Sequence, residues 1–331
     1  MKRMKKLISI NVLRGIACLI VLFAHIISTS ATYGMYVSGC GKIGVWCFLV
    51  ISGFLTVYNV KKDDSEKVYR YISKYYLNKI IRLYPAYIIG LILAYKFGFI
   101  TEMENVFFLI GNTGWGHFWY MPVILKYYLI APIFIIAYKK MNPAVFGVVV
   151  GVIGTVFSVL YPYTECPENS TILRWYIPVF IMGMLVCLMY KHMDGIKNEI
   201  IFITMFIIGV ISALIFTPYI RKVFWDVQPS RWLQNKYLLY GIIWSIILFS
   251  VIKSRYISKL FEKCRILKFI GEISYEVYIV HYIILLYIGN CITNTITRGL
   301  WTVVVSLFVA TIVHYIMEYI IKSIRKSNLK T

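Results

Sequence analysis

Ten stretches of the chain are each long enough and apolar enough to cross a lipid bilayer as a helix. A membrane-spanning helix needs about 20 mainly apolar residues. Such segments form helices because the hydrocarbon core offers no water to an unpaired backbone. The sequence therefore predicts an all-α, polytopic membrane protein with about ten transmembrane helices. These stretches lie at about 7–28, 40–60, 80–98, 118–138, 144–161, 172–190, 199–217, 236–252, 271–291 and 301–321.

The composition excludes a soluble or a disordered chain. Hydrophobic residues make up 60% of the 331 residues and charged residues 15%, and the mean hydropathy is +0.74. A typical soluble domain is about 45–50% apolar and about 25% charged. The first stretch follows a basic segment like a signal peptide, but no small-residue cleavage site ends it, so we expect a retained helix.

The net charge of +21 would suit a nucleic-acid-binding protein, but its distribution indicates membrane topology instead. With ten alternating spans, most of the 35 Lys and Arg residues fall on the side that holds both termini. Basic loops mark the cytoplasmic side. We therefore expect cytoplasmic N- and C-termini, a multi-pass protein of the plasma (inner) membrane, and no nucleic-acid partner. No appended soluble domain is expected, so residues 1–331 form a single integral membrane domain.

Two polar side chains stand out in the first span. Arg14 and His25 are eleven residues apart, which is close to three helical turns, so both project from one face. An ionisable residue within a span indicates a functional site by default. We interpret this face as the lining of a cavity with a cation at its cytoplasmic end and a proton acceptor deeper in. In the alternative interpretation, Arg14 extends to the inner headgroups and His25 is a packing residue.

The spacing of Arg14 and His25 resembles the leading signature of the acyltransferase-3 family of integral membrane O-acyltransferases. Four further stretches resemble motifs of that family in the same order. They are 44–54, which ends in Ser-Gly-Phe, the basic-x-x-Arg-x-x-Pro of 79–85, the His-Phe-Trp-Tyr of 117–120 with Tyr128 and Pro132 of the Trp-led fourth helix, and 271–281 with its Ser-Tyr-x-x-Tyr-x-x-His. The chain departs from the family pattern at Trp46, Lys79 and Ile124, which leaves the acceptor open.

The resemblance implies an acyl-CoA donor, usually acetyl-CoA, as co-substrate. Transfer of an acyl group to a hydroxyl needs a base, and His25 is the best candidate because a neutral imidazole can accept a proton near pH 7. Direct transfer and an acyl-His intermediate are both possible. Arg14, Lys79 and Arg82 suit the phosphates of the donor. Membrane anchoring alone would also explain Lys79 and Arg82.

Five further residues are candidates for binding the acceptor or supporting the site. Trp119 and Tyr120 would line the outer opening of the predicted cavity. Alternatively, they belong to the belt of Trp and Tyr residues that membrane proteins carry at the membrane–water interface. Ser52 would allow another backbone to approach the second span closely, although helix packing alone also favours small residues there. Tyr278 and His281 share one face of the ninth span with Ser274 and would hydrogen-bond across the bundle or support the site, although helix packing alone would also explain them. In the last span, the i, i+4 spacing of His314 and Glu318 predicts a local pair.

No metal is expected, because the seven Cys residues are scattered and include no Cys-x-x-Cys pair. The sequence thus predicts an enzyme that transfers an acyl group, most often acetyl, from cytoplasmic acyl-CoA to a carbohydrate or glycolipid of the cell envelope. The alternatives are a transporter or flippase of a polar lipid or sugar intermediate, and a structural partner of an envelope synthase. No paired broken helices and no two-fold hydropathy repeat are visible, which favours the enzyme. Acceptor, acyl length and oligomeric state remain open at this point.

Overall fold

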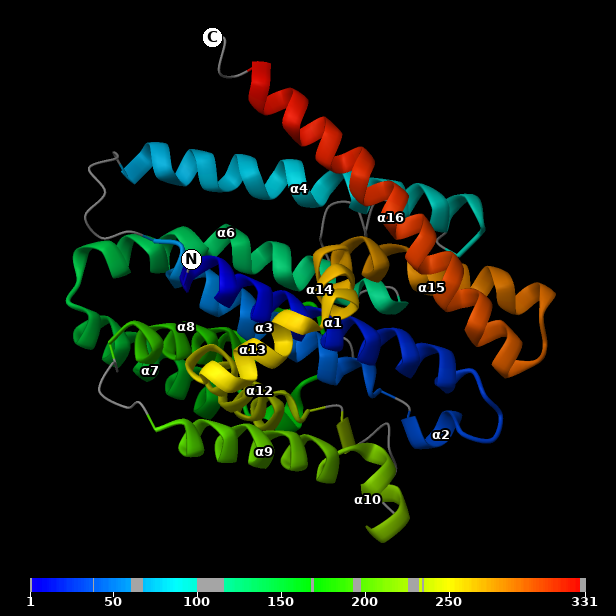
Figure 1. Ribbon diagram of the computed structural model, residues 1–331, viewed down its shortest axis with the longest axis horizontal. Helices are drawn as coiled ribbons and strands as arrows, with labels where there is room; N and C mark the ends of the chain where they lie inside the picture. Colours follow the sequence, from blue (N-terminus) through cyan, green and yellow to red (C-terminus); the bar gives the residue numbers. More distant parts are fainter. Residues whose placement is uncertain are drawn as a thin grey trace.

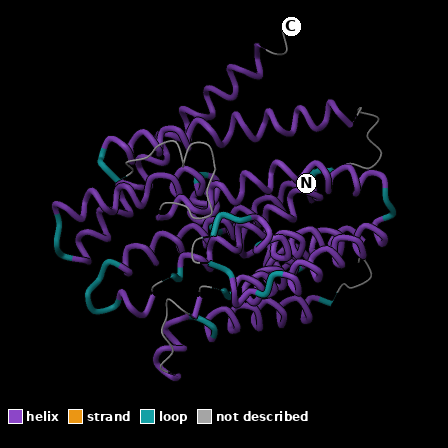
Figure 2. Tube along the Cα trace, turned by 180° about the vertical axis from the view of Figure 1, so that it is seen from behind, coloured by secondary structure: helices purple, strands orange, loops and turns teal. Residues whose placement is uncertain are grey.

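The computed structural model describes residues 2–37, 39–60, 68–99, 116–167, 170–192, 198–225, 232–233 and 235–327. Within these ranges all of the secondary-structure elements are α-helices or short 3-10 helices (Figure 2). The first half contains α1 (Lys2–Ser28), α2 (Gly34–Val37), α3 (Gly41–Tyr58), α4 (Val68–Lys96), η1 (Gly116–Trp119), α6 (Tyr120–Lys140), α7 (Pro143–Leu160) and η2 (Tyr163–Glu165). The second half contains η3 (Leu173–Trp175), α8 (Ile177–His192), α9 (Glu199–Ile215), α10 (Pro218–Trp225), α12 (Tyr237–Lys253), α13 (Arg255–Lys263), α14 (Arg265–Glu272), α15 (Ser274–Cys291) and α16 (Thr295–Ser327).

Each of the ten predicted apolar stretches falls on a helix. Among the described residues, six helices are long and apolar enough to cross a membrane, and up to nine spans result if each of three bent helix pairs is one span. The helix Ile177–His192 is apolar but shorter than the other spans. The helical membrane architecture is therefore confirmed, whereas ten spans and cytoplasmic termini stay predictions.

The centre of the bundle is α3. In Figure 1 the axes of α1, α3, α4, α6, α7, α8 and α9 run in roughly the same direction, and α14 lies across them. α3 packs against α1, α8 and α12, and its side chains Trp46, Leu49 and Phe54 are buried. In contrast, α7, α9 and α16 expose large apolar side chains, such as Val159, Ile200 and Phe308. Apolar surface of this extent is stable when it faces lipid rather than water.

Three helix pairs bend sharply at a short break, by 59° between α9 and α10, 90° between α12 and α13, and 78° between α14 and α15. No paired half-length broken helices are visible in the sequence, but the structure contains these three bent pairs, each of which is a broken span or a re-entrant loop. The bend after α12 is stabilised by Glu199 of α9, whose carboxylate accepts hydrogen bonds from the Arg255 backbone N–H at 2.9 Å and from the Ser254 hydroxyl at 2.8 Å. A carboxylate at a helix N-terminus satisfies free N–H groups and the helix dipole.

Glycines allow two helix pairs to approach until their backbones touch. A methyl group built at Gly271 of α14 would lie 1.7 Å from the backbone oxygen of Asn11 in α1, and one at Gly15 would lie 2.1 Å from that of Leu267. Gly53 of α3 and Gly183 of α8 make a similar contact. Small residues at such crossings allow the close packing that holds helices together in a bilayer. The α1–α14 contact fixes the turn of α1 that carries Arg14.

Candidate active site

A cavity of about 150 Å³, lined by both apolar and polar side chains, lies among α1, α3, α4, α6 and α15. Three cationic side chains, Arg14 from α1 and Lys79 and Arg82 from α4, line it together with hydroxyl groups of serines and tyrosines. Nine polar residues from five helices therefore line one space, as is expected of polar side chains within membrane-spanning helices. The polar lining residues other than the cations are Ser52, Tyr120, Tyr128, Ser274, Tyr275 and Tyr278.

A second cavity, of about 470 Å³, adjoins the first. Ser52, Leu55, Lys79, Arg82 and Tyr128 line both spaces. The second cavity extends along the N-terminal half of α4, where Lys74 and Asn78 also line it. Together the two cavities form a basic passage from the first half of α4 to Arg14. The residues from Val68 onward belong to the continuous helix α4.

The cations of the cavity are held beside aromatic rings and hydroxyls. Lys79 Nζ lies 3.6 Å from the centre of the Tyr128 ring, a cation–π contact. The Tyr128 hydroxyl lies 3.3 Å from Ser52 Oγ. Within the described part of the chain, no carboxylate forms an ion pair with Arg14 within 4.0 Å. The guanidinium at the end of the passage therefore retains its donors for an anionic ligand.

The polar faces predicted for α1 and α15 face each other. Near Arg14, the Cys18 thiol lies 3.9 Å from the Ser274 backbone oxygen, and two turns further along the same helices His25 contacts His281. The interface between α1 and α15 thus joins the cavity at one end to a group of histidines at the other. The predicted hydrogen bond of His281 across the bundle is present.

The histidine group consists of His25, His117 and His281. His25 Nδ1 lies 2.8 Å from His281 Nε2, and the ring centres of His117 and His281 are 5.2 Å apart. Tyr278 belongs to both regions, because it lines the cavity and its hydroxyl donates a hydrogen bond to the His117 backbone oxygen. His281 and His117 are buried, whereas His25 is partly exposed.

Three predicted site residues, His25, His281 and Trp119, lie outside the lining of both cavities. The nearest described link between the first cavity and the histidines is Tyr278, which lines that cavity and contacts His117. A passage shared by Arg14 and His25 therefore stays a prediction. Trp119 is buried and packs against Tyr120 and Tyr176, with ring centres 6.1 and 5.9 Å away. It supports Tyr120 rather than lining an outer opening.

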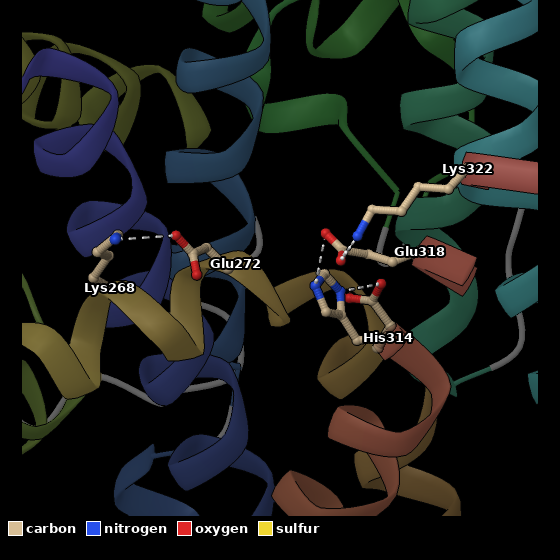
Figure 3. Close-up of polar contacts among 6 residues, drawn as sticks. Lys268, Glu272, His314, Glu318 and Lys322 are labelled. Carbon is tan, nitrogen blue, oxygen red and sulfur yellow. Dashed lines mark hydrogen bonds and ion pairs between the residues drawn. The ribbon is translucent and has the colours of Figure 1, made fainter. Parts of the chain in front are cut away.

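A second polar group joins α15 to α16 (Figure 3). His314 Nδ1 lies 3.1 Å from Glu276 Oε1 of α15, and His314 Nε2 lies 3.9 Å from Glu318 Oε1. Glu318 also binds Lys322 at 3.1 Å. The predicted local pair is thus present, but the shorter contact runs to Glu276, a buried carboxylate that the sequence argument passed over. Its position inside the ninth predicted span was the signal that identifies it.

His117 and Tyr128 are the other residues that the sequence argument did not assign to the site. Both lie within the motif that begins the fourth predicted span, but neither has a distinctive spacing there. Within the described ranges, no three His, Cys, Asp or Glu side chains are grouped so that they could hold a metal ion.

The fold and cavity define a helical membrane protein with a basic internal site. The sequence model described as an acyltransferase domain, that of the acyltransferase-3 family, matches residues 7–319. The chain belongs to the acyltransferase-3 family.

Relatives of this chain occur in Staphylococcus aureus. Proteins of strains COL, N315 and MW2, each named "Putative O-acetyltransferase", are 20% identical to it over 325 residues, which cover 87% of this chain and 52% of each relative. The chain therefore spans about half the length of the curated relatives it matches. No solved structure matches the chain.

Proposed function

We propose that this protein is a membrane-bound O-acyltransferase that moves an acyl group, most often acetyl, from acyl-CoA to a hydroxyl of a cell-envelope carbohydrate or glycolipid. The observation that carries the proposal is the gathering of Arg14, Lys79 and Arg82 around one cavity inside an apolar bundle. Membership of the acyltransferase-3 family and the names of the relatives support the reaction type. We place the protein in the plasma membrane as a single membrane domain.

Acyl-CoA carries several phosphate charges, and the passage along α4 supplies matching cations. Lys74, Lys79 and Arg82 would bind the phosphates as the donor enters, and Arg14 would bind the donor at the inner end. The tyrosines and Ser52 supply hydroxyl donors and acceptors for the polar groups of the pantetheine arm. This assignment places donor entry at the basic, cytoplasmic end of the bundle that the charge distribution predicts.

In the proposed reaction, the hydroxyl oxygen of the acceptor bonds to the thioester carbonyl carbon while His25 accepts the hydroxyl proton. The carbon–sulfur bond then breaks, and the thiolate of coenzyme A leaves and takes the proton from His25. In the alternative route, the acyl group is first transferred to His25 and then to the acceptor hydroxyl, so the same overall reaction takes place in two steps. Tyr278 links the first cavity to the histidine group, so the acyl end of the donor passes it to reach His25.

Replacement of Arg82 by alanine is expected to raise the KM for acetyl-CoA about threefold to tenfold, because a partly solvated charge contact contributes about 1 kcal/mol. The KM for the acceptor should change little. Arg70→Ala is the matched control, since Arg70 is an exposed arginine on the same helix and lines neither cavity. An unchanged donor KM in Arg82→Ala would count against the donor passage.

The function itself is tested with purified protein in proteoliposomes, labelled acetyl-CoA and envelope glycans or lipid-linked sugars. The proposal requires label in an ester of the glycan and one free thiol released per ester formed. The three bent helix pairs keep the transporter as a second candidate, because transporters often use broken helices at their binding sites. Movement of the acceptor across the bilayer without any acyl donor would support the transporter instead.

A further inference from the structure

We propose that His281 is a positioning residue that fixes the ring tautomer of His25, so that Nε2 of His25 is the nitrogen without a proton. This inference deepens the proposed function and rests on it, because His25 is the base there. It follows from the hydrogen bonds that surround the two rings.

The contact between the rings is a direct, in-plane hydrogen bond. His25 Nδ1 and His281 Nε2 are 2.8 Å apart, and the ring planes differ by 7°. The ring centres are 5.1 Å apart, which two rings reach when their nitrogens point straight at each other in a common plane. One nitrogen must therefore carry the proton and the other must accept it.

The surroundings of His281 decide which nitrogen carries that proton. His281 Nδ1 lies 2.9 Å from the Tyr278 backbone oxygen and 3.0 Å from that of Val277. A carbonyl oxygen only accepts hydrogen bonds, so His281 Nδ1 carries a proton and Nε2 of the neutral ring has none. His25 Nδ1 must then donate to His281 Nε2, which leaves His25 Nε2 without a proton.

The free nitrogen faces the beginning of α3. A methyl group built at Gly41 would lie 3.5 Å from His25 Nε2, and among the described residues this nitrogen has no hydrogen-bond partner. When Nε2 accepts a proton, the imidazolium still donates from Nδ1 to His281, and a hydrogen bond from a charged donor is stronger. The pair therefore stabilises His25 more in its protonated form, as a base in acyl transfer requires.

The tautomer can be measured directly. The chain has five histidines, so a protein labelled with ¹⁵N at histidine rings gives five sets of ring signals in proteoliposomes, and His25→Gln identifies the set of His25. Protonated and bare ring nitrogens have well-separated shifts. We expect His25 and His281 each to carry the proton on Nδ1. A proton on Nε2 of His25 in the unaltered protein would overturn the proposal.

Kinetics of two variants test the consequence. His281→Phe keeps an aromatic ring but removes the acceptor, so kcat should fall about 10- to 100-fold, a part of what a positioned base supplies, at unchanged donor KM. His25 should then show a mixture of tautomers. His281→Gln retains an oxygen that accepts from His25 Nδ1, and its kcat should be intermediate. His192→Gln, outside both regions, should match the unaltered protein.

The outcomes separate this proposal from the proposed function. Loss of activity in His25→Ala together with unchanged kcat in His281→Phe overturns the positioning role alone. Full activity in His25→Ala overturns the assigned base and the positioning role with it. If His281→Phe does not fold, the ring signals of the unaltered protein still decide the tautomer.

Discussion

Replacement of His25 by alanine is expected to lower kcat for acyl transfer about 10²- to 10⁴-fold, which is the gain that a positioned general base supplies. Nε2 of His25 faces the start of α3 and has no hydrogen-bond partner among the described residues, so it is open to accept a proton. The donor KM should stay nearly constant, because His25 lines neither of the two basic cavities. The measurement is a steady-state assay with labelled acetyl-CoA in proteoliposomes.

His192→Ala is the control for that experiment, since His192 ends α8 and lies outside both the cavity and the histidine group. Size-exclusion chromatography and thermal unfolding in detergent would show that His25→Ala is folded. Undiminished transfer by a folded His25→Ala protein would remove this residue from the reaction. A large rise in donor KM at constant kcat would instead move His25 to the donor site.

Replacement of Gly271 by alanine is expected to destabilise the protein by about 1–3 kcal/mol or more, as overpacking of a well-packed contact does. The new methyl group would lie 1.7 Å from the backbone oxygen of Asn11, so α14 must move away from α1. The neighbouring turn of α1 carries Arg14, and donor binding should weaken as well. Thermal unfolding in detergent and the donor KM measure the two effects.

Gly151→Ala makes the same substitution where a side chain has room. Gly151 lies in α7, and a methyl group built there would have no atom within 4 Å. Alanine is favoured over glycine in a helix by about 1 kcal/mol, so this variant should be as stable as the unaltered protein or slightly more stable. Equal unfolding temperatures for the Gly271 and Gly151 variants would show that α1 and α14 are not in close contact.

The helices could be predicted because apolar stretches of fixed length have one stable form in lipid. The bends could be predicted less well. Pro218 marks the break before α10, and Ser254 caps α13, because its hydroxyl accepts a hydrogen bond from the Ile257 backbone N–H. Ile273 occupies a break that no local residue preference indicates. At Ser254 the bend depends on the carboxylate of Glu199, which is more than 50 residues away in the chain. A sequence pattern read along one helix does not contain such a contact.

The candidate site, like the fold, could be predicted from the sequence only in part. Arg14 could be predicted because it is a charged residue within an apolar span, and Lys79 and Arg82 because they form a basic-x-x-Arg-x-x-Pro motif. The structure gathers the three around one cavity. The polar faces of α1 and α15 were also predictable from helical spacing. Which helices pair was not, because lipid provides no hydrophobic preference for one neighbour over another. The contact of His25 with His281 and the place of Glu276 beside His314 follow from that pairing.

The separation of the basic cavity from His25 also limits which donors the protein can use under the proposed function. Arg14 and His25 are eleven residues apart in helix α1, which corresponds to about 16 Å along the helix axis. A donor anchored by its phosphates at one end of that distance must carry its reactive carbonyl on an extended arm of comparable length. The length of α1 between these two residues would then set the length of donor that can react. A small activated acyl compound such as acetyl phosphate would be too short to reach from the basic cavity to His25.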